Sequence, residues 1–284
     1  MNKFLSLFPV VRIQLSDWIH SSRTFISLGI IFLLTYMNSR DLAYTLEYSH
    51  LYAHIGEAIV YYLATGFGNF LLVSAIYLVM ISEIPRKSSF QYAVLIRTNR
   101  KAWYFSQVLS CFFIVLVSVS IMLLLSIAFS IPFLTPGKGW SDSERMLKNV
   151  ESESSFLPSY ITAEPIFSVA FLSGAILYSF WLVMTLSIFI ATLCNRATTG
   201  LLIFAFILST KVTILWESIS EFSLFFPTDY ATLINISYIP GVNDKICTAW
   251  HALIVYIIIE VAEIMIGWKI VCNKDLCFIS EARS

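Results

Sequence analysis

The sequence predicts an all-α, polytopic membrane protein, and its composition and the spacing of its apolar runs both indicate this class. Hydrophobic residues make up 58% of the 284 residues and charged residues only 13%, with a mean hydropathy of +0.78. The polar stretches between the apolar runs are at most about 30 residues long, well below the roughly 100 residues of a usual soluble domain. We therefore expect residues 1–284 to form a single transmembrane domain.

The N-terminal segment, residues 1–23, is predicted to be an interfacial helix. Phe8, Val11 and Leu15 repeat apolar side chains at helical spacing, and polar residues fill many of the positions between them. Asp17 interrupts the place where a cleavable signal peptide has its apolar core. We expect this helix to lie on the inner leaflet.

Six apolar runs are each predicted to be a membrane-spanning helix. They are residues 24–38, 55–81, 106–134, 165–193, 199–216 and 249–271. The first run is short, about 22 Å as a helix, so we expect it to begin within the preceding helix or to tilt little. Gly66 and Gly68 permit a break or a close helix contact in the second run, while Pro132 and Pro136 end the third.

Three segments between these runs are assigned to the outside. Residues 40–54 are polar and aromatic, and residues 135–165 are the most polar stretch of the chain, expected to be a loop with little core of its own. Residues 217–248 contain only short apolar pieces bounded by Pro227 and Pro240. This pattern suits re-entrant or interfacial helices before the last span.

The distribution of charge predicts the orientation of the chain. With these spans, 12 Lys and Arg residues lie inside, 5 lie outside and Lys211 lies in the membrane, out of 18 in a chain of formal net charge +0. Basic residues are enriched in the cytoplasmic loops of membrane proteins. Both termini are therefore predicted to be cytoplasmic.

The densest basic cluster lies between the second and third spans, in residues 83–104. Ser88 and Ser89 are suitable caps for a short helix, on which Phe90 and Val94 recur at helical spacing. The basic residues of the segment are Arg86, Lys87, Arg97, Arg100 and Lys101. We interpret it as a docking or membrane-surface helix with one apolar and one basic face; the alternative is a topology signal and nothing more.

Two carboxylates, Glu260 and Glu263, lie on one helix face near the middle of the sixth span. A carboxylate at this depth costs about 2.5 to 3.5 kcal/mol on insertion scales unless it is paired, protonated or in contact with water. One hypothesis pairs the two with Lys211 of the fifth span, or has them line a cavity for a cationic substrate. The other makes them a structural lock between helices.

The sequence contains no catalytic constellation, and we do not expect an enzyme. There is no phosphate-binding lysine loop and no nucleophile motif, and the five cysteines show no metal-ligand spacing. His50 and His54 have an i, i+4 spacing, which alone is a weak indication of a metal site. We expect no metal and no cofactor in this chain, and no nucleic-acid partner.

The order of these features resembles the transmembrane subunit of ABC-2 type transporters, in loose motifs that cover nearly the whole chain. The most specific part is Glu83 followed by Arg97, Arg100 and Trp103. It is similar to the family's pattern of an acidic residue ending span two and an Arg-rich helix leading into span three. The resemblance implies that residues 86–104 are the coupling helix that contacts the ATPase subunit.

The resemblance further implies the permease subunit of an ATP-driven exporter in the cell (plasma) membrane. Its implied partners are an ATP-binding cassette subunit that holds ATP and magnesium, a second permease chain in a homodimer or heterodimer, and membrane lipid. The acidic outer face is compatible with export of a peptide, such as an antimicrobial peptide. The alternatives are an ion-coupled secondary transporter or membrane sensor using Glu260, Glu263 and Lys211, and a membrane scaffold without transport.

Overall fold

The computed structural model describes residues 7–50, 52–64, 67–82, 84, 100–137, 139–141, 165–194, 200–201, 231 and 249–273. Their regular elements are α1 Leu7–Ile19, α2 Ser22–Ser49, α3 Ile55–Ala64, α4 Phe67–Ile81, α6 Arg100–Ser130, the 3-10 turn η1 Ile131–Phe133, α9 Ile166–Leu193 and α12 Ala249–Asn273. Within this part of the chain, the extended backbone pairs only at an isolated parallel bridge between Ala53 and Leu134. The all-α prediction is confirmed.

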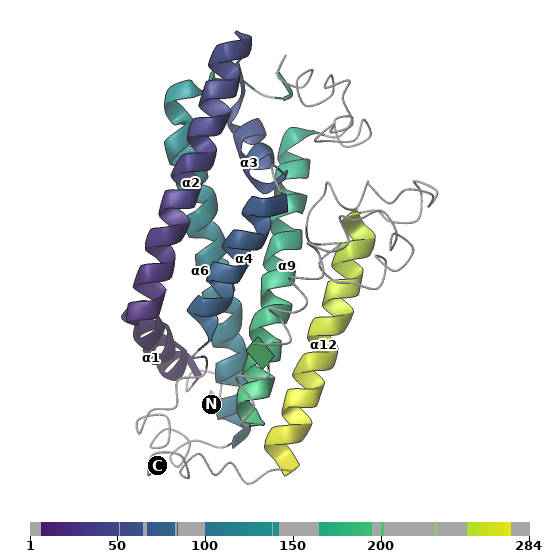
Figure 1. The fold of residues 1–284 in the computed structure, drawn as a ribbon. Helices are drawn as coiled ribbons and strands as arrows, with labels where there is room; N and C mark the ends of the chain where they lie inside the picture. The colour runs from purple at the N-terminus through teal and green to yellow at the C-terminus, as the bar shows by residue number, and fades with distance from the viewer. Residues whose placement is uncertain are drawn as a thin grey trace, which may run out of the picture.

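The long helices stand side by side as a bundle (Figure 1). α9 contacts α3, α4, α6 and α12, and most of its side chains are buried, as expected for a helix that is apolar all round. α1 lies across the lower end of the bundle, against α6, and is bent by 64° from α2. The start of α6 and the end of α12 lie at the same lower end.

Two described helices are long and apolar enough to cross a membrane. They are α6 with the turn that follows it, Arg100–Phe133, and α9, Ile166–Leu193. α1 and α2 make a third if the bent pair is one span. Pro132 lies in η1 directly after α6, as predicted, and Pro165 is the N-cap of α9.

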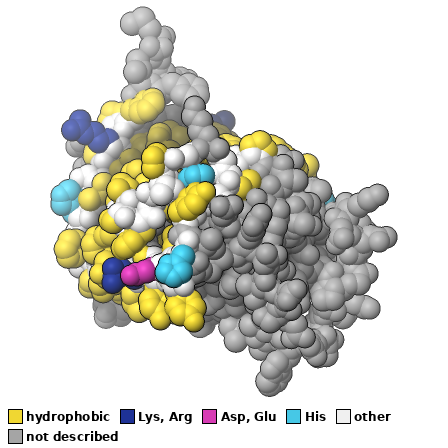
Figure 2. Space-filling view, turned by 90° about the horizontal axis from the view of Figure 1, so that it is seen from above, with side chains coloured by type: hydrophobic (Ala, Val, Ile, Leu, Met, Phe, Trp, Pro, Cys, Tyr) yellow, Lys and Arg dark blue, Asp and Glu magenta, His cyan; other side chains and the backbone are white. Residues whose placement is uncertain are grey.

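Unlike a water-soluble helical protein, the described bundle exposes many large apolar side chains, and small polar side chains lie among the apolar ones of its interior. On α2, Thr24, Ser27 and Thr35 are buried. Its exposed large apolar side chains include Phe25, Ile26, Ile30, Phe32, Leu33, Tyr36 and Met37. Hydrophobic side chains also cover much of the described surface seen from above (Figure 2). Such a surface indicates contact with hydrocarbon, which supports membrane association.

Several buried hydroxyl groups form hydrogen bonds within their own helices. Each donates to the carbonyl oxygen four residues earlier, at 2.7 to 2.8 Å. The donors are Thr35, Ser110, Ser118, Ser173, Thr185 and Thr192. These short side chains let neighbouring helices approach closely while their polar atoms remain bonded.

A stacked aromatic pair joins α4 to α9 in the middle of the bundle. The ring centroids of Tyr77 and Trp181 are 4.0 Å apart, with 8° between the ring planes. The Tyr77 hydroxyl lies 2.7 Å from Oγ1 of Thr185, and Trp181 Nε1 donates to Ser74 Oγ at 3.2 Å. Thr185 already donates its proton to the carbonyl of Trp181, so Tyr77 is the donor in its bond to Thr185.

A buried carboxylate joins the start of α3 to the segment after α6, at the upper end of the bundle. Glu57 is 2% exposed, and one of its oxygens accepts from the backbone N–H of His54 at 2.6 Å. The other accepts from the backbone N–H of Ser141 at 2.7 Å and from the Ser141 hydroxyl at 2.9 Å. His54 Nδ1 also lies 2.9 Å from the carbonyl oxygen of Gly139. We call this set the Glu57 cluster.

The helix of the first predicted span extends well beyond residue 38, because α2 continues to Ser49 through most of the segment that is predicted to lie outside. Leu42, Ala43 and Leu46 are buried and prolong the packed face of the helix, while polar side chains such as Glu47 stay exposed. A polar composition was therefore compatible with a helix that has one buried face.

The predicted second span, residues 55–81, is described as two helices, α3 and α4, and residues 65–66 between them lie outside the described residues. The last predicted span is found as the helix α12. Residues 85–99, 142–164, 202–230 and 232–248 also lie outside the described residues. The coupling segment, most of the outer loop, the fifth span and the re-entrant segment therefore stay predictions.

Candidate functional site

Glu260 and Glu263 face α9 from the neighbouring helix α12. The Ser187 hydroxyl donates to Oε1 of Glu263, and the Ser179 side chain forms a hydrogen bond with Glu260. The two carboxyl groups therefore meet α9 at two different serines, on a helix whose other side chains are mostly apolar.

Each carboxyl group also has a buried oxygen that lacks a hydrogen-bond partner among the described residues, namely Oε1 of Glu260 and Oε2 of Glu263. The Glu260 side chain as a whole is 9% exposed. A buried polar atom left unsatisfied costs about 1–3 kcal/mol. In chemical terms, the pair is able to accept a further donor or a cation, or to hold a proton between α9 and α12. Within the described part of the chain, no three His, Cys, Asp or Glu residues are placed to hold a metal ion.

Most other predicted site residues are not described. Lys211, Arg86, Lys87, Phe90, Val94 and Arg97 all lie outside the described residues. Arg100 and Lys101 form the first turn of α6, where both are exposed at the lower end of the bundle. The structure thus shows where the basic segment enters the bundle.

Directly after those two residues, α6 is bonded to α12 through Tyr104, which is 1% exposed. Its hydroxyl donates to the backbone carbonyl of Ile264 at 2.6 Å. The ring lies against Gly267, where an added Cβ would be 2.6 Å from the hydroxyl oxygen and 3.2 Å from Cε2 of Tyr104. The absence of a side chain at Gly267 is what allows the phenol to reach the backbone of α12.

Aromatic rings enclose this contact, which we call the α6–α12 junction. The Tyr104 ring centroid lies 5.9 Å from that of Phe189 on α9 and 5.7 Å from that of Trp268 on α12. Lys101 Nζ lies 5.6 Å from the Trp268 centroid, within the range of a cation–π contact. Glu263 is one helical turn from Gly267, so the junction adjoins the carboxyl groups.

Two features of the structure were missed by sequence reasoning. The α6–α12 junction depends on a tyrosine and a glycine far apart in the chain; the one available signal was Gly267, a glycine inside an apolar helix, which often marks a close approach. The Glu57 cluster is a capping box in which Glu57 reaches back to the N–H of His54. Histidine in place of Ser or Thr at the cap concealed that pattern.

The spacing of His50 and His54 does not place them on one helix. His50 ends α2 with a left-handed φ of 55°, and His54 precedes α3. The His54 ring is bonded to Gly139. The helical i, i+4 geometry that would bring both rings to one metal is therefore not formed.

Comparison of the chain with known protein families, with characterised proteins and with solved structures gives no match. The fold and site define a class: an all-α protein whose described residues include two helices, or three with the bent pair, that are long and apolar enough to cross a membrane. Its distinguishing features are paired carboxyl groups at the α9–α12 interface and a tight junction between α6 and α12.

Proposed function

We propose that the chain is the transmembrane permease subunit of an ATP-driven exporter, with six spans, re-entrant helices before the last span, and both termini in the cytoplasm. The observation that carries this proposal is the α6–α12 junction. The basic segment runs into α6, and within the first turns of that helix Tyr104 is bonded to α12. A displacement of the basic segment would move α12, which carries Glu260 and Glu263.

The charges of the described residues support this orientation. The Lys and Arg residues described at the lower end of the bundle are Arg12, Arg23, Arg100, Lys101 and Lys269. Asp17 is the acidic residue described there. At the upper end, Asp41, Glu47 and Glu57 are described with Arg40. An excess of basic residues is typical of the cytoplasmic side.

In this mechanism a separate ATPase subunit, holding ATP and magnesium, closes on nucleotide and pushes residues 86–104. The α6–α12 junction then carries that motion to α12, and two permease chains rearrange about a shared path. The chain itself hydrolyses nothing. A peptide is the favoured cargo, because the predicted outer segments are acidic.

The first test is isolation of the chain in mild detergent with identification of the proteins that stay bound. An ATP-binding cassette subunit is the expected partner. In the reconstituted complex, Arg97→Glu with Arg100→Glu should reduce transport and substrate-stimulated ATP hydrolysis. Arg40→Glu, an exposed change at the other end of the bundle, is the matched control. A monodisperse chain without an ATPase, or normal coupling in the double variant, would contradict the proposal.

One observation favours a second function, an ion-coupled carrier or membrane sensor. Glu260 and Glu263 each keep a buried oxygen that has no partner within the described residues, as expected of groups that bind and release a proton or cation. Vesicles holding the chain alone would then accumulate substrate in response to a proton gradient without nucleotide. No accumulation under those conditions would exclude the carrier.

A further inference from the structure

A groove lies between α1 and α6 at the lower end of the bundle. Its volume is about 400 Å³, within the range of about 300 to 1,000 Å³ that is usual for small-ligand sites. The apolar part of its wall includes Phe8, Leu15 and Ile19 of α1 and Phe113 of α6. Phe8 is 58% and Ile19 is 55% exposed, so the groove opens to the surroundings of the protein. We call it the α1–α6 groove.

The depth of the groove in the bundle follows from the contact that holds α1. The Ser110 side chain of α6 is hydrogen-bonded to the Gln14 side chain of α1, and both residues are buried. α6 begins at the basic end and runs toward the membrane interior, so Phe113 lies about one turn above this bond. The groove therefore occupies the side of α1 that would face the inner leaflet.

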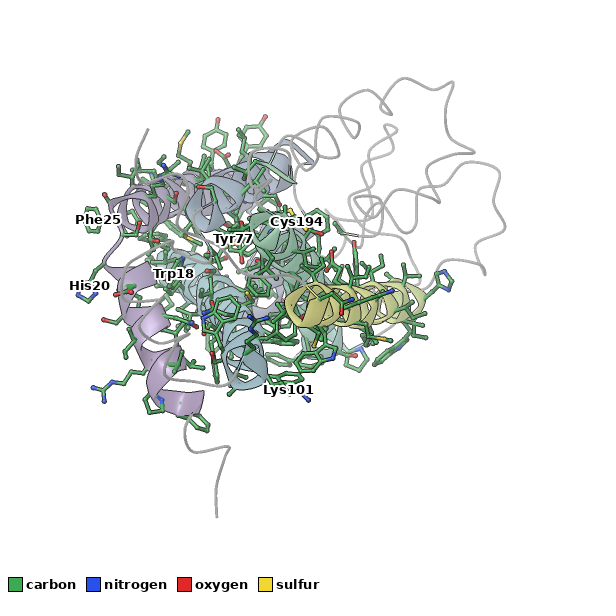
Figure 3. All side chains as sticks on the ribbon, turned by 90° about the horizontal axis from the view of Figure 1, so that it is seen from below. Trp18, His20, Phe25, Tyr77, Lys101 and Cys194 are labelled. Atoms are coloured by element: carbon green, nitrogen blue, oxygen red, sulfur yellow. The ribbon has the colours of Figure 1, made fainter. Side chains whose placement is uncertain are left out.

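The rim of the groove is polar and basic. Arg12, Ser16 and His20 belong to its lining, and all three are exposed. Nδ1 of His20 lies 2.7 Å from the carbonyl oxygen of Ser16, and the ring points away from the bundle while Trp18 points into it (Figure 3). Arg12 has no hydrogen-bond or ion-pair partner among the described residues. Its five N–H donors are therefore available to an anion.

We propose that the α1–α6 groove binds one anionic phospholipid of the inner leaflet. An acyl chain lies against the apolar wall, and the phosphate bonds to the guanidinium of Arg12 with His20 beside it. A guanidinium matches two phosphate oxygens at once, and the cytoplasmic leaflet is the anionic one. The joined apolar wall and basic rim fit a phospholipid and do not fit free phosphate. The inference rests on the orientation proposed above and is independent of ATP-driven transport.

The test is native mass spectrometry of the delipidated full chain in an uncharged detergent, titrated with phosphatidylglycerol and phosphatidylcholine that have identical acyl chains. We expect one phosphatidylglycerol to bind about five-fold more tightly than phosphatidylcholine, the effect of one basic side chain near an anionic lipid. Arg12→Gln should remove that preference, and Arg40→Gln should keep it. Leu15→Trp, which fills the groove, should weaken binding of both lipids.

Each other outcome overturns the site. Equal binding of the two lipids, or an unchanged preference in Arg12→Gln, would show that Arg12 holds no headgroup. Displacement of phosphatidylglycerol by glycerol 3-phosphate would indicate a site for a free phosphate ester. A dimer in the spectra that Leu15→Trp dissociates would make the groove a contact between two chains. None of these readouts involves an ATPase, so failure here is distinct from failure of the proposed function.

Discussion

The hydroxyl of Tyr104 donates a 2.6 Å hydrogen bond to the carbonyl oxygen of Ile264, a residue 160 positions later in the chain. This single bond joins the helix that follows the basic segment to the helix that carries Glu260 and Glu263. It is possible only because Gly267, one turn further along α12, presents no side chain to the tyrosine ring.

Gly267→Ala should destabilise the protein by about 1–3 kcal/mol, because the new methyl group overpacks the α6–α12 junction. The measurement is the Tm of the purified chain in detergent. Gly29→Ala is the control, since a Cβ there has no neighbouring atom within 4 Å, and its Tm should be unchanged or higher. In a Tyr104→Phe background the cost of Gly267→Ala should shrink, because the closest atom is gone. An equal cost in both backgrounds would show that the hydroxyl is not the obstacle.

Glu57→Gln should lower the free energy of unfolding by about 1–3 kcal/mol. Both carboxylate oxygens accept backbone N–H groups, from His54 and Ser141, and the amide must turn its own NH₂ toward one of them. Chemical denaturation of the variant in detergent measures the loss. The exposed Glu47→Gln on α2 is the control and should change little. Similar values for the two variants would mean that the Glu57 cluster contributes no stability.

Tyr77→Phe should cost about 0.5–1.5 kcal/mol, since it removes one buried hydrogen bond to Thr185 and keeps the ring. Tyr77→Ala should cost more, about 3–5 kcal/mol, because it also removes the stack on Trp181 and leaves a cavity. Tm values and Trp fluorescence of both variants distinguish the two contributions. If Phe proved as costly as Ala, the hydroxyl and not the stacked ring would be the main link between α4 and α9.

Glu263→Gln should leave Tm unchanged or raise it. The amide oxygen still accepts from Ser187, and the change removes an ionisable group that has a buried, unpartnered oxygen among the described residues. Ser187→Ala, which removes the one described donor, should lower Tm instead. A fall in Tm for Glu263→Gln would point to a cationic partner outside the described residues, and Lys211→Gln would then produce the same fall.

The long apolar helices could be predicted from the sequence because a long run of apolar residues is enough to identify them. α6, α9 and α12 each contain a long apolar run, and α6 and α9 are bounded by prolines that cannot continue a helix. The C-terminal half of α2 was harder to predict, since its residues are polar on one face and the helix depends on burial of Leu42, Ala43 and Leu46. Composition averages over both faces and so conceals a half-buried helix.

The site was predictable only in part. The cost of a carboxylate in hydrocarbon identifies Glu260 and Glu263 from sequence alone, but the serines that meet them are ordinary residues of an apolar helix. Tyr104 is one of 14 tyrosines, and nothing local distinguishes it. Its role arises from a contact with Gly267 that exists only after α6 and α12 have packed together.

The hydroxyl groups bonded within their own helices have a consequence for biogenesis. A helix whose Ser and Thr protons are donated to its own backbone exposes fewer unsatisfied polar groups to hydrocarbon, so we expect it to insert before it meets a partner helix. The oxygen of such a hydroxyl can still accept a hydrogen bond from another helix. Oγ1 of Thr185 donates to the carbonyl oxygen of Trp181 in its own helix and accepts from the hydroxyl of Tyr77 on α4. The same side chain thus satisfies its own proton within one helix and accepts a second hydrogen bond from another.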